Sequence, residues 1–350
     1  FEGRAGAGAR FEGETRTGWL GADARSGRWV AGLAVSRGTS GTDYTLEGEQ
    51  GRIETALNAL WPYGRWTFRN GLELRGLAGA GSGTARHAPE GDAPHETSRL
   101  AMRAGSLGLR QAFAPLDGFD LAVRADASFA RMETDRGEEA VDGLRADSWR
   151  LRGGLEASKP FALQDGATLK PFAELAARRD GGDGVAGSGV ELAGGLRYAA
   201  AGVSVEARGR WLAAHSEKGV RERGLSATVR LDPEAGGRGL SLSLTPRWGA
   251  HAGGSGALWR EEAPQASGVS DAGALDARLG WGFALAPGAG GLLTPFAEAG
   301  MAGGGDRRLR LGTRFEVRQG ALALELAGER RETAAEQPEH AVRLELRIGF

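Results

Sequence analysis

The five histidines are the residues of this chain best suited to acid–base or metal chemistry. His87, His95, His215, His251 and His340 all fall on or beside predicted loops at one end of a series of strands. A histidine with an acidic partner can act as a general base, so one hypothesis is a hydrolytic site at this end. No two histidines have the spacing of zinc ligands, and polar residues collect in loops without any catalytic role. We therefore predict that the chain is not an enzyme and has no catalytic residue, no cofactor, no cofactor-binding residue and no metal ligand.

Two other local patterns could support chemistry. Ser98, Ser216 and Ser255 lie in or near the same predicted loops, but no G-x-S-x-G motif surrounds any of them. The stretch Asp180–Gly184 reads Asp-Gly-Gly-Asp-Gly, which is similar to one unit of a calcium-binding repeat. A single unit cannot stack on a neighbour, so we interpret the stretch as a flexible turn.

Alternation of apolar and charged residues is the strongest pattern in the chain, and it is clearest in the last eleven residues. The apolar set on one side is Val342, Leu344, Leu346, Ile348 and Phe350, and Arg343, Glu345 and Arg347 lie between them. Successive side chains of a strand point to opposite faces, so this segment predicts a strand with one apolar and one charged face.

The same alternation recurs and gives about 17 strands, each long enough to cross a bilayer when tilted. Unpaired charge in hydrocarbon costs several kcal/mol per group, so the charged faces are expected to line a water-filled lumen, where they pair across strands. The predicted lumen-facing residues are Arg52, Glu54, Arg69, Glu73, Arg75, Arg124, Asp126, Arg150, Arg152, Glu156, Glu206, Arg208, Arg210, Arg247, Arg278, Arg310, Arg314, Glu316, Arg343, Glu345 and Arg347.

Composition narrows the class of protein. The chain has 350 residues with 60 glycines, no cysteine and a net charge of −1. Disulfides and thiolate metal sites are excluded, and the charge gives no basis for binding nucleic acid. No apolar run approaches the ~20 residues of a membrane helix. We predict an all-β fold, an antiparallel up-and-down transmembrane β-barrel of about 16–18 strands that forms one domain over residues 1–350.

The connections are predicted to alternate in length. Short turns are expected at Ser26-Gly27 and Pro62-Tyr63-Gly64, and longer polar loops at Thr39–Gln50 and Ala80–Glu96. Bacterial barrels place short turns in the periplasm and long loops outside, which puts the C-terminus at the periplasmic end. Leu100–Arg110 changes phase near Gly105, which is interpreted as a β-bulge.

The predicted strand count is odd, whereas single-chain bacterial barrels have even counts. Either one more strand precedes Phe1, or residues near the N-terminus form a partial strand. Because the chain starts without Met or a leader, we expect it to be the C-terminal part of a longer polypeptide.

Several segments resemble the C-terminal autotransporter β-domain. The resemblance covers about Gly18 to Phe350 and includes GWLGADARSGRWVAGLAVSRGTSGTDYTLEG, LNALWPYGRWTFRNGLELRGLAGAGSG, GRGLSLSLTPRWG and the terminal LRIGF. It implies a barrel in the outer membrane of a Gram-negative bacterium that anchors and translocates an N-terminal passenger of the same polypeptide. It also implies that the final strand, through Leu344, Leu346, Ile348 and Phe350, is the signal read by the barrel-assembly machinery. The better-known family members have 12 strands and a pore helix, whereas this sequence offers more strands and no evident helix before the first one.

Three other functions stay open at this level. A porin-like diffusion channel fits a barrel of 16 to 18 strands. A rim enzyme would use His95, His215 or His251, and a soluble all-β binding protein would bury its apolar faces between two sheets. For a membrane barrel, the further expected partner is outer-membrane lipid or lipopolysaccharide.

Overall fold

The protein is described by a computed structural model. The described residues are 2–5, 9–46, 49–89, 95–136, 142–234, 236–249, 273–285, 291–302, 305, 307–317, 322–332 and 339–348. Within this part of the chain, no helix has the length and apolar character needed to span a bilayer.

The described residues form one large antiparallel sheet. Its strands are β1 (Glu2–Ala5), β2 (Ala9–Ser26), β3 (Trp29–Leu46), β4 (Glu49–Thr67), β5 (Leu72–Pro89), β6 (Glu96–Ala112), β7 (Asp120–Thr134), β8 (Arg145–Ser158), β9 (Phe161–Ala162), β10 (Thr168–Gly182), β11 (Gly187–Ala200), β12 (Val203–His215), β13 (Arg223–Leu231), β14 (Gly239–Gly249), β15 (Gly273–Ala284), β16 (Leu292–Ala302), β17 (Arg307–Val317), β18 (Leu322–Glu332) and β19 (Glu339–Ile348).

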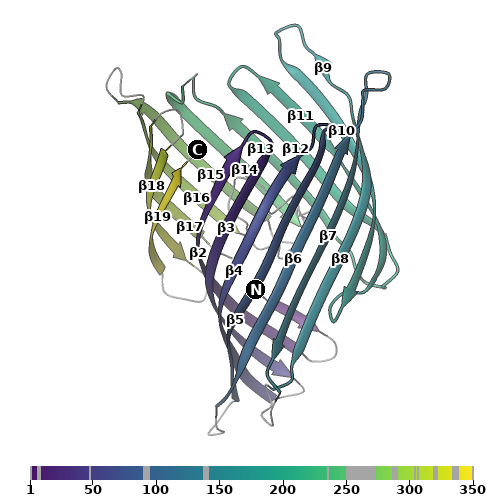
Figure 1. The fold of residues 1–350 in the computed structure, drawn as a ribbon, viewed down its shortest axis with the longest axis vertical. Helices are drawn as coiled ribbons and strands as arrows, with labels where there is room; N and C mark the ends of the chain where they lie inside the picture. The colour runs from purple at the N-terminus through teal and green to yellow at the C-terminus, as the bar shows by residue number, and fades with distance from the viewer. Residues whose placement is uncertain are drawn as a thin grey trace.

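Nearly every strand pairs with its sequence neighbours, as in an up-and-down barrel. β9 is a short continuation of β8, because both pair with β10 in successive registers. The ladder then runs from β10 to β19 without a crossover. The two ends of the sheet approach each other, since Cα atoms of β19 lie within 8 Å of β2, and the yellow and purple strands lie side by side (Figure 1). The predicted antiparallel all-β fold is confirmed, and the four-residue strand β1 is a partial strand of the kind expected near the N-terminus.

Curvature separates the two faces of the sheet. Side chains on the concave inner face crowd together, whereas those on the convex outer face splay apart. On β10, Phe172, Glu174 and Arg178 are buried, and Leu175 between them is 54% exposed. The outer face carries most of the exposed large apolar residues, and the charged ladders lie on the inner face, as the alternation predicts for most strands.

The turn predicted at Pro62-Tyr63-Gly64 is wrong, because β4 runs through it. Pro62 has no N–H, and the β4–β5 register accordingly skips from Leu60 to Tyr63 while the β3–β4 register is continuous. The chain turns at residues 68–71 instead, where Gly71 has a φ of 79°.

The loops predicted at Thr39–Gln50 and Ala80–Glu96 are largely strand. β3 to β6 have 17 to 19 residues each, and their hairpins extend toward the bottom of Figure 1. Threonine and tyrosine favour strands, and cross-strand pairs such as Arg52 with Asp43 hold the hairpin beyond the apolar region. The bulge predicted near Gly105 is also wrong, because the registers of β6 with β5 and with β7 pass through Gly105 unbroken.

We name the two rims of the sheet by their connections. The turn rim contains the connections at residues 27–28, 68–71, 113–119 and 201–202. The loop rim is the opposite end, where β3, β5, β7, β10 and β12 end and β4, β6, β8, β11 and β13 begin. Exposed aromatic side chains lie near both rims, with Trp66 and Phe113 at the turn rim and Trp149 and Trp211 toward the loop rim. Trp61 departs from this pattern, because it lies on the inner face and donates a hydrogen bond to Ser36 Oγ at 2.9 Å.

Candidate functional site: the charged inner wall

The inner face of β7 to β12 carries a connected set of ion pairs, which we call the buried network. We count in it five arginines and five carboxylates, most of them buried, and Arg75 of β5 extends the set, with its Nη2 3.9 Å from Asp126 Oδ1. Its members are Arg150, Arg152, Arg178, Arg208, Arg210, Asp126, Glu174, Asp180, Glu191 and Glu222.

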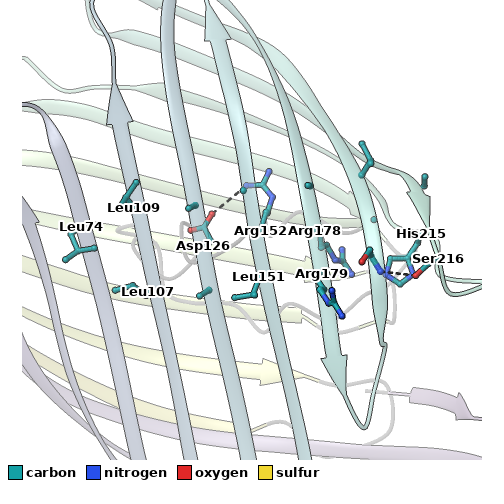
Figure 2. Close-up of a pocket in the computed structure, with 18 residues that line it drawn as sticks. Leu74, Leu107, Leu109, Asp126, Leu151, Arg152, Arg178, Arg179, His215 and Ser216 are labelled. Carbon is teal, nitrogen blue, oxygen red and sulfur yellow. Dashed lines mark hydrogen bonds and ion pairs between the residues drawn. The ribbon is translucent and has the colours of Figure 1, made fainter.

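Arg152 and Glu191 form the centre of the buried network. Arg152 Nε donates to Glu191 Oε2 at 2.7 Å, although β10 lies between their two strands. Arg152 also donates to Glu174 and lies 3.6 Å from Asp126 (Figure 2). Glu191, which is 1% exposed, accepts further hydrogen bonds from Arg178 and Arg210. Side chains from five strands, β7, β8, β10, β11 and β12, are thereby connected across the inner face.

Arg178 connects this centre to the loop rim. Both of its terminal nitrogens donate to Glu222, at 2.8 and 2.7 Å, and its Nε donates to Asp180 at 2.5 Å. Burial acts to raise the pKa of Glu222, but the hydrogen bonds from Arg178 and the positive charges of Arg210 and Arg150 outweigh it and lower that pKa. The loop at residues 216–222 is therefore fastened to the wall by a two-bonded ion pair.

Equal numbers of positive and negative groups explain how so much charge is buried. A single buried ion is costly to remove from water, but ions with several charged hydrogen-bond partners recover that cost. The sequence predicted hydrated side chains on this face. The structure instead shows a packed ionic layer in which the side chains screen one another from solvent.

Phe172 adds an aromatic contact on the same face. Its ring lies 4.3 Å from Arg197 Cζ and 5.9 Å from Arg208 Cζ, distances that fit cation–π contacts. A side chain on Gly195 would clash with this ring, so glycine at that position leaves room for it. Phe296 repeats the arrangement on β16, with Arg278 at 4.4 Å and Arg310 at 5.3 Å.

A second set of ion pairs, the open network, lies on the inner face of β14 to β18. Its members are Arg247, Arg278, Arg308, Arg310, Asp276, Glu298 and Glu325. Glu298 Oε1 lies 2.9 Å from Arg278 Nη1, and Glu298 Oε2 lies 3.1 Å from Arg310 Nη1. These side chains are 10–40% exposed, so water reaches this half of the wall.

Most of the predicted lumen-facing residues share the inner face. Besides the members of the two networks, Glu73, Arg75 and Arg124 fall there by alternation, and Arg124 Nη2 lies 2.7 Å from Glu156 Oε2. Glu206, Arg314 and Glu316 also share this face, where Arg197 pairs with Glu206 and Arg314 with Glu316. The side chains of Arg343, Glu345, Leu346, Arg347 and Ile348, and all of Phe350, lie outside the described residues, and Leu344 is 64% exposed.

Three of the predicted positions need correction. Arg52 and Glu54 lie on the outer face, because they alternate with the buried Ala59 and share a face with the exposed Leu60. They stand at the extended end of the β3–β4 hairpin, where the alternation continues beyond the apolar band and no longer separates lipid from water. Arg69 lies in the turn at residues 68–71 and not in a strand.

The sequence interpretation missed the strand that contributes most to the buried network. Glu174, Arg178 and Asp180 follow Phe172 at every second position, the spacing used to find the other ladders. Asp180 was assigned to a flexible turn because glycines follow it, but it lies in β10, where it accepts a hydrogen bond from Arg150 at 2.6 Å. Glu191 and Glu222 gave no comparable signal, since neither belongs to a run of alternating charges.

The histidines do not gather into one site. His87 lies on β5, where its Nε2 is 2.6 Å from the Tyr44 hydroxyl, and His215 ends β12 with its Nε2 3.5 Å from Asp180. A register shift opposite Val190 and Glu191 brings the buried His215 ring to the inner face. His95 and His340 are exposed, and His251 and Ser255 lie outside the described residues.

The predicted serine candidates do not join the histidines in an accessible site. Ser98 is buried on β6, and Ser216 Oγ accepts a hydrogen bond from the Ser188 N–H at 2.9 Å. The described residues contain no group of three or more His, Cys, Asp or Glu side chains arranged to hold a metal ion.

Comparison with known proteins identifies the family. The model of the autotransporter β-domain matches residues 2–214, which is more than half of the chain. This chain belongs to the autotransporter β-domain family. The match ends within β12, so it covers the buried network almost entirely. An autotransporter β-domain is a barrel of the Gram-negative outer membrane through which a passenger is exported.

Several solved structures are similar to this autotransporter β-domain. The β domain of the Bordetella autotransporter Brka is 22% identical, covering 58% of this chain and 83% of that one, with a TM-score of 0.36. The ferripyoverdine receptor of the Pseudomonas aeruginosa outer membrane is 13% identical, covering 97% and 58%, with a TM-score of 0.41. The alcaligin receptor FauA from Bordetella pertussis is 12% identical, covering 96% and 65%, with a TM-score of 0.40. No curated protein matches the sequence.

Proposed function

We propose that this β-domain anchors and exports an N-terminal passenger of its own polypeptide, with the C-terminus in the periplasm and the loop rim outside the cell. The observation that carries the proposal is the family match over residues 2–214, which coincides with a sheet of neighbour-paired strands. The exposed apolar outer face and the charged inner face support a wall between lipid and a polar lumen.

Surface display tests the proposal directly. A signal peptide and an epitope-tagged reporter are joined ahead of Phe1, and intact cells are treated with protease. We expect the reporter to be cleaved while the barrel keeps its heat-modifiable migration on gels. A reporter that stays protected in cells whose barrel is assembled would contradict export, and an epitope placed at residues 250–272 reports orientation separately.

The final strand is proposed to be the signal for the barrel-assembly machinery. Val342 and Leu344 of β19 point out of the sheet and are strongly exposed, which supports an apolar outer face available for recognition. Phe350→Ala is expected to lower the amount of assembled barrel, whereas Phe315→Ala on β17 serves as a matched control inside the sheet. Equal assembly of the two variants would argue against this role.

A diffusion channel is the second candidate, and the width of the sheet favours it. Seventeen of the described strands have nine or more residues, a number in the range of barrels that leave an aqueous channel. Planar-bilayer recording of the full chain separates the two functions. Stable open-channel current together with a protected reporter would favour the channel over the exporter.

A further inference from the structure

Three bands follow one another on the outer face of β6, β7 and β8. The first is part of a shallow, mainly apolar groove of about 1030 Å³ that extends from β5 to β12 (Figure 2). Its lining includes Leu107, Ala127 and Leu151 on these strands and the exposed Arg179 on β10. The second, closer to the loop rim, contains Phe129 and Trp149. The third contains Arg103 and Arg131.

The registers place these bands in order. Leu107, Ala127 and Leu151 lie directly opposite one another in adjacent strands. Phe129 and Trp149 form the next outward pair, and their rings cover Gly105 and Gly181 on the neighbouring strands. Apolar, aromatic and cationic residues therefore succeed one another toward the loop rim, the order expected where hydrocarbon gives way to headgroups.

Arg103 and Arg131 are direct cross-strand partners, an arrangement that like charges disfavour. Arg131 Nη2 lies 3.4 Å from Asp147 Oδ2, but that carboxylate makes a shorter 2.7 Å bond to Arg145 Nη2. Glu133 also lies on this face, with Arg145 as its register partner. Arg103 is exposed, and no ion pair of its side chain occurs among the described residues. The carboxylates of this face, Asp147, Glu133 and Asp183, gather around Arg145, and Asp183 Oδ2 accepts a hydrogen bond from the Asp147 N–H at 2.7 Å. The positive charge of Arg103 and Arg131 is therefore balanced least.

The height of the pair fits a membrane interface. Arg103 lies nine residues from Ala112, the end of β6 at the turn rim. At ~3.3 Å per residue and a tilt of about 40°, that distance gives roughly 23 Å of height, close to the ~25 Å apolar band of an outer-membrane barrel. The two guanidinium groups are therefore at the level of the outer-leaflet headgroups, provided that the loop rim faces outside as proposed above.

We propose that this surface binds a phosphorylated lipid of the outer leaflet, with a phosphate between Arg103 and Arg131 and acyl chains in the groove. Guanidinium groups match phosphate oxygens in geometry and charge, and an anion between two arginines removes their repulsion. The groove beside the aromatic band supplies apolar contact for the chains. The inference rests on the proposed orientation and adds to it a defined lipid site.

A charge reversal separates lipid binding from simple repulsion. In Arg103→Glu, the introduced carboxylate pairs with Arg131 and repels phosphate. Native mass spectrometry of the purified full chain should show at least tenfold weaker binding of diphosphoryl lipid A than in the wild type. The same variant should unfold at a higher temperature in lipid-free detergent, because the like-charge pair is gone. Arg103→Ala should also weaken binding.

Arg37→Glu is the matched control. Arg37 is an exposed outer-face residue eight positions from Trp29 at the turn rim, and its register partners are the uncharged Gly18 and Asn58. Its reversal should leave lipid A binding within about twofold of the wild type. Equal binding of diphosphoryl and dephosphorylated lipid A by the wild type, or equal weakening in both reversals, would overturn the phosphate site.

The orientation assay distinguishes the two proposals. An epitope at residues 250–272 that is accessible on intact cells, combined with unchanged lipid binding in Arg103→Glu, would overturn only the lipid site. An epitope reached only from the periplasm would overturn the orientation and the lipid site together.

Discussion

The two halves of the wall differ in the length of their strands and in the network of ion pairs on their inner face. β2 to β12, apart from the short β9, have 13 to 19 residues and contain the buried network, whereas β13 to β19 have 9 to 12 residues and contain the open network. A tilted strand needs about 9–11 residues to cross the hydrocarbon. The short half is therefore just tall enough for a membrane, and the long half rises beyond it with a more tightly packed inner face.

The inner faces of the two halves differ in how deeply their charged side chains are buried, and not in whether they carry charge. Both inner faces are built from arginine–carboxylate ladders, and both contain a buried phenylalanine between two arginines. The side chains of Arg152, Arg178, Glu174 and Glu191 are at most 4% exposed, whereas those of the open network are 10–40% exposed. Ion pairs in the two halves should consequently differ in what their loss costs.

Removing one carboxylate from each half gives the largest expected contrast. Glu191→Gln leaves three buried arginines short of one negative charge and should destabilise the barrel by about 3–5 kcal/mol. Glu298→Gln in the wetter half should cost about 1 kcal/mol, because water replaces the lost partner. Urea unfolding followed by heat-modifiable gel migration measures both, and equal costs would erase the distinction between the networks.

Truncating the two phenylalanines should instead make the halves behave alike. Phe172 and Phe296 are each 5% exposed and each contact two arginines. Phe172→Ala and Phe296→Ala should each cost about 3 kcal/mol through lost burial and an unfilled cavity. The same unfolding assay applies, and a difference above about 1.5 kcal/mol would show that the surrounding network, and not the ring, sets the cost.

Acidification should first release the loop at residues 216–222 from the inner face of the long half. The pKa of Glu222 is lower in the folded protein than in the unfolded chain, so its ion pair contributes fully above the unfolded value of about 4.3. That contribution is lost as the pH falls through the lower, folded value. With a protease active at each pH, residues 216–222 should be cut more readily at pH 3 than at pH 6. Glu222→Gln should be cut at both pH values, and a cleavage pattern independent of pH in the wild type would contradict the ion pair's role.

Shortening the tall hairpin should have the smallest effect. Replacing residues 41–54 by Asn-Gly joins Ser40 to Thr55, which are already cross-strand partners, through a favoured two-residue turn. The remaining strands still cross the membrane, so the yield of heat-modifiable barrel should change by less than about twofold. A comparable loss from the β18–β19 hairpin should abolish assembly, because those strands have no residues to spare.

The sequence was sufficient to predict which face of a strand each side chain occupies, because that depends only on local alternation. Leu240, Leu242 and Leu244 lie on the outer face, with Ser241 and Ser243 between them on the inner face, as period-2 spacing requires. Strand ends were predicted less well, because Pro62 and the glycines mark turns in isolated segments but are accommodated here by neighbouring strands. The partners of Arg178 were not predictable, since Glu222 lies 44 positions away and meets it only after the sheet curves.

The equal charge count of the buried network has a consequence for cargo. The electrostatic potentials of alternating unit charges a few ångströms apart cancel one another within a short distance of the wall. This distance is well inside one Debye length, which is about 8 Å at physiological salt. Acidic and basic stretches of an emerging polypeptide would therefore experience the same, nearly flat potential along β7 to β12. Such a surface is indifferent to the sequence that slides past it, which suits a conduit whose passenger can vary while the barrel stays unchanged.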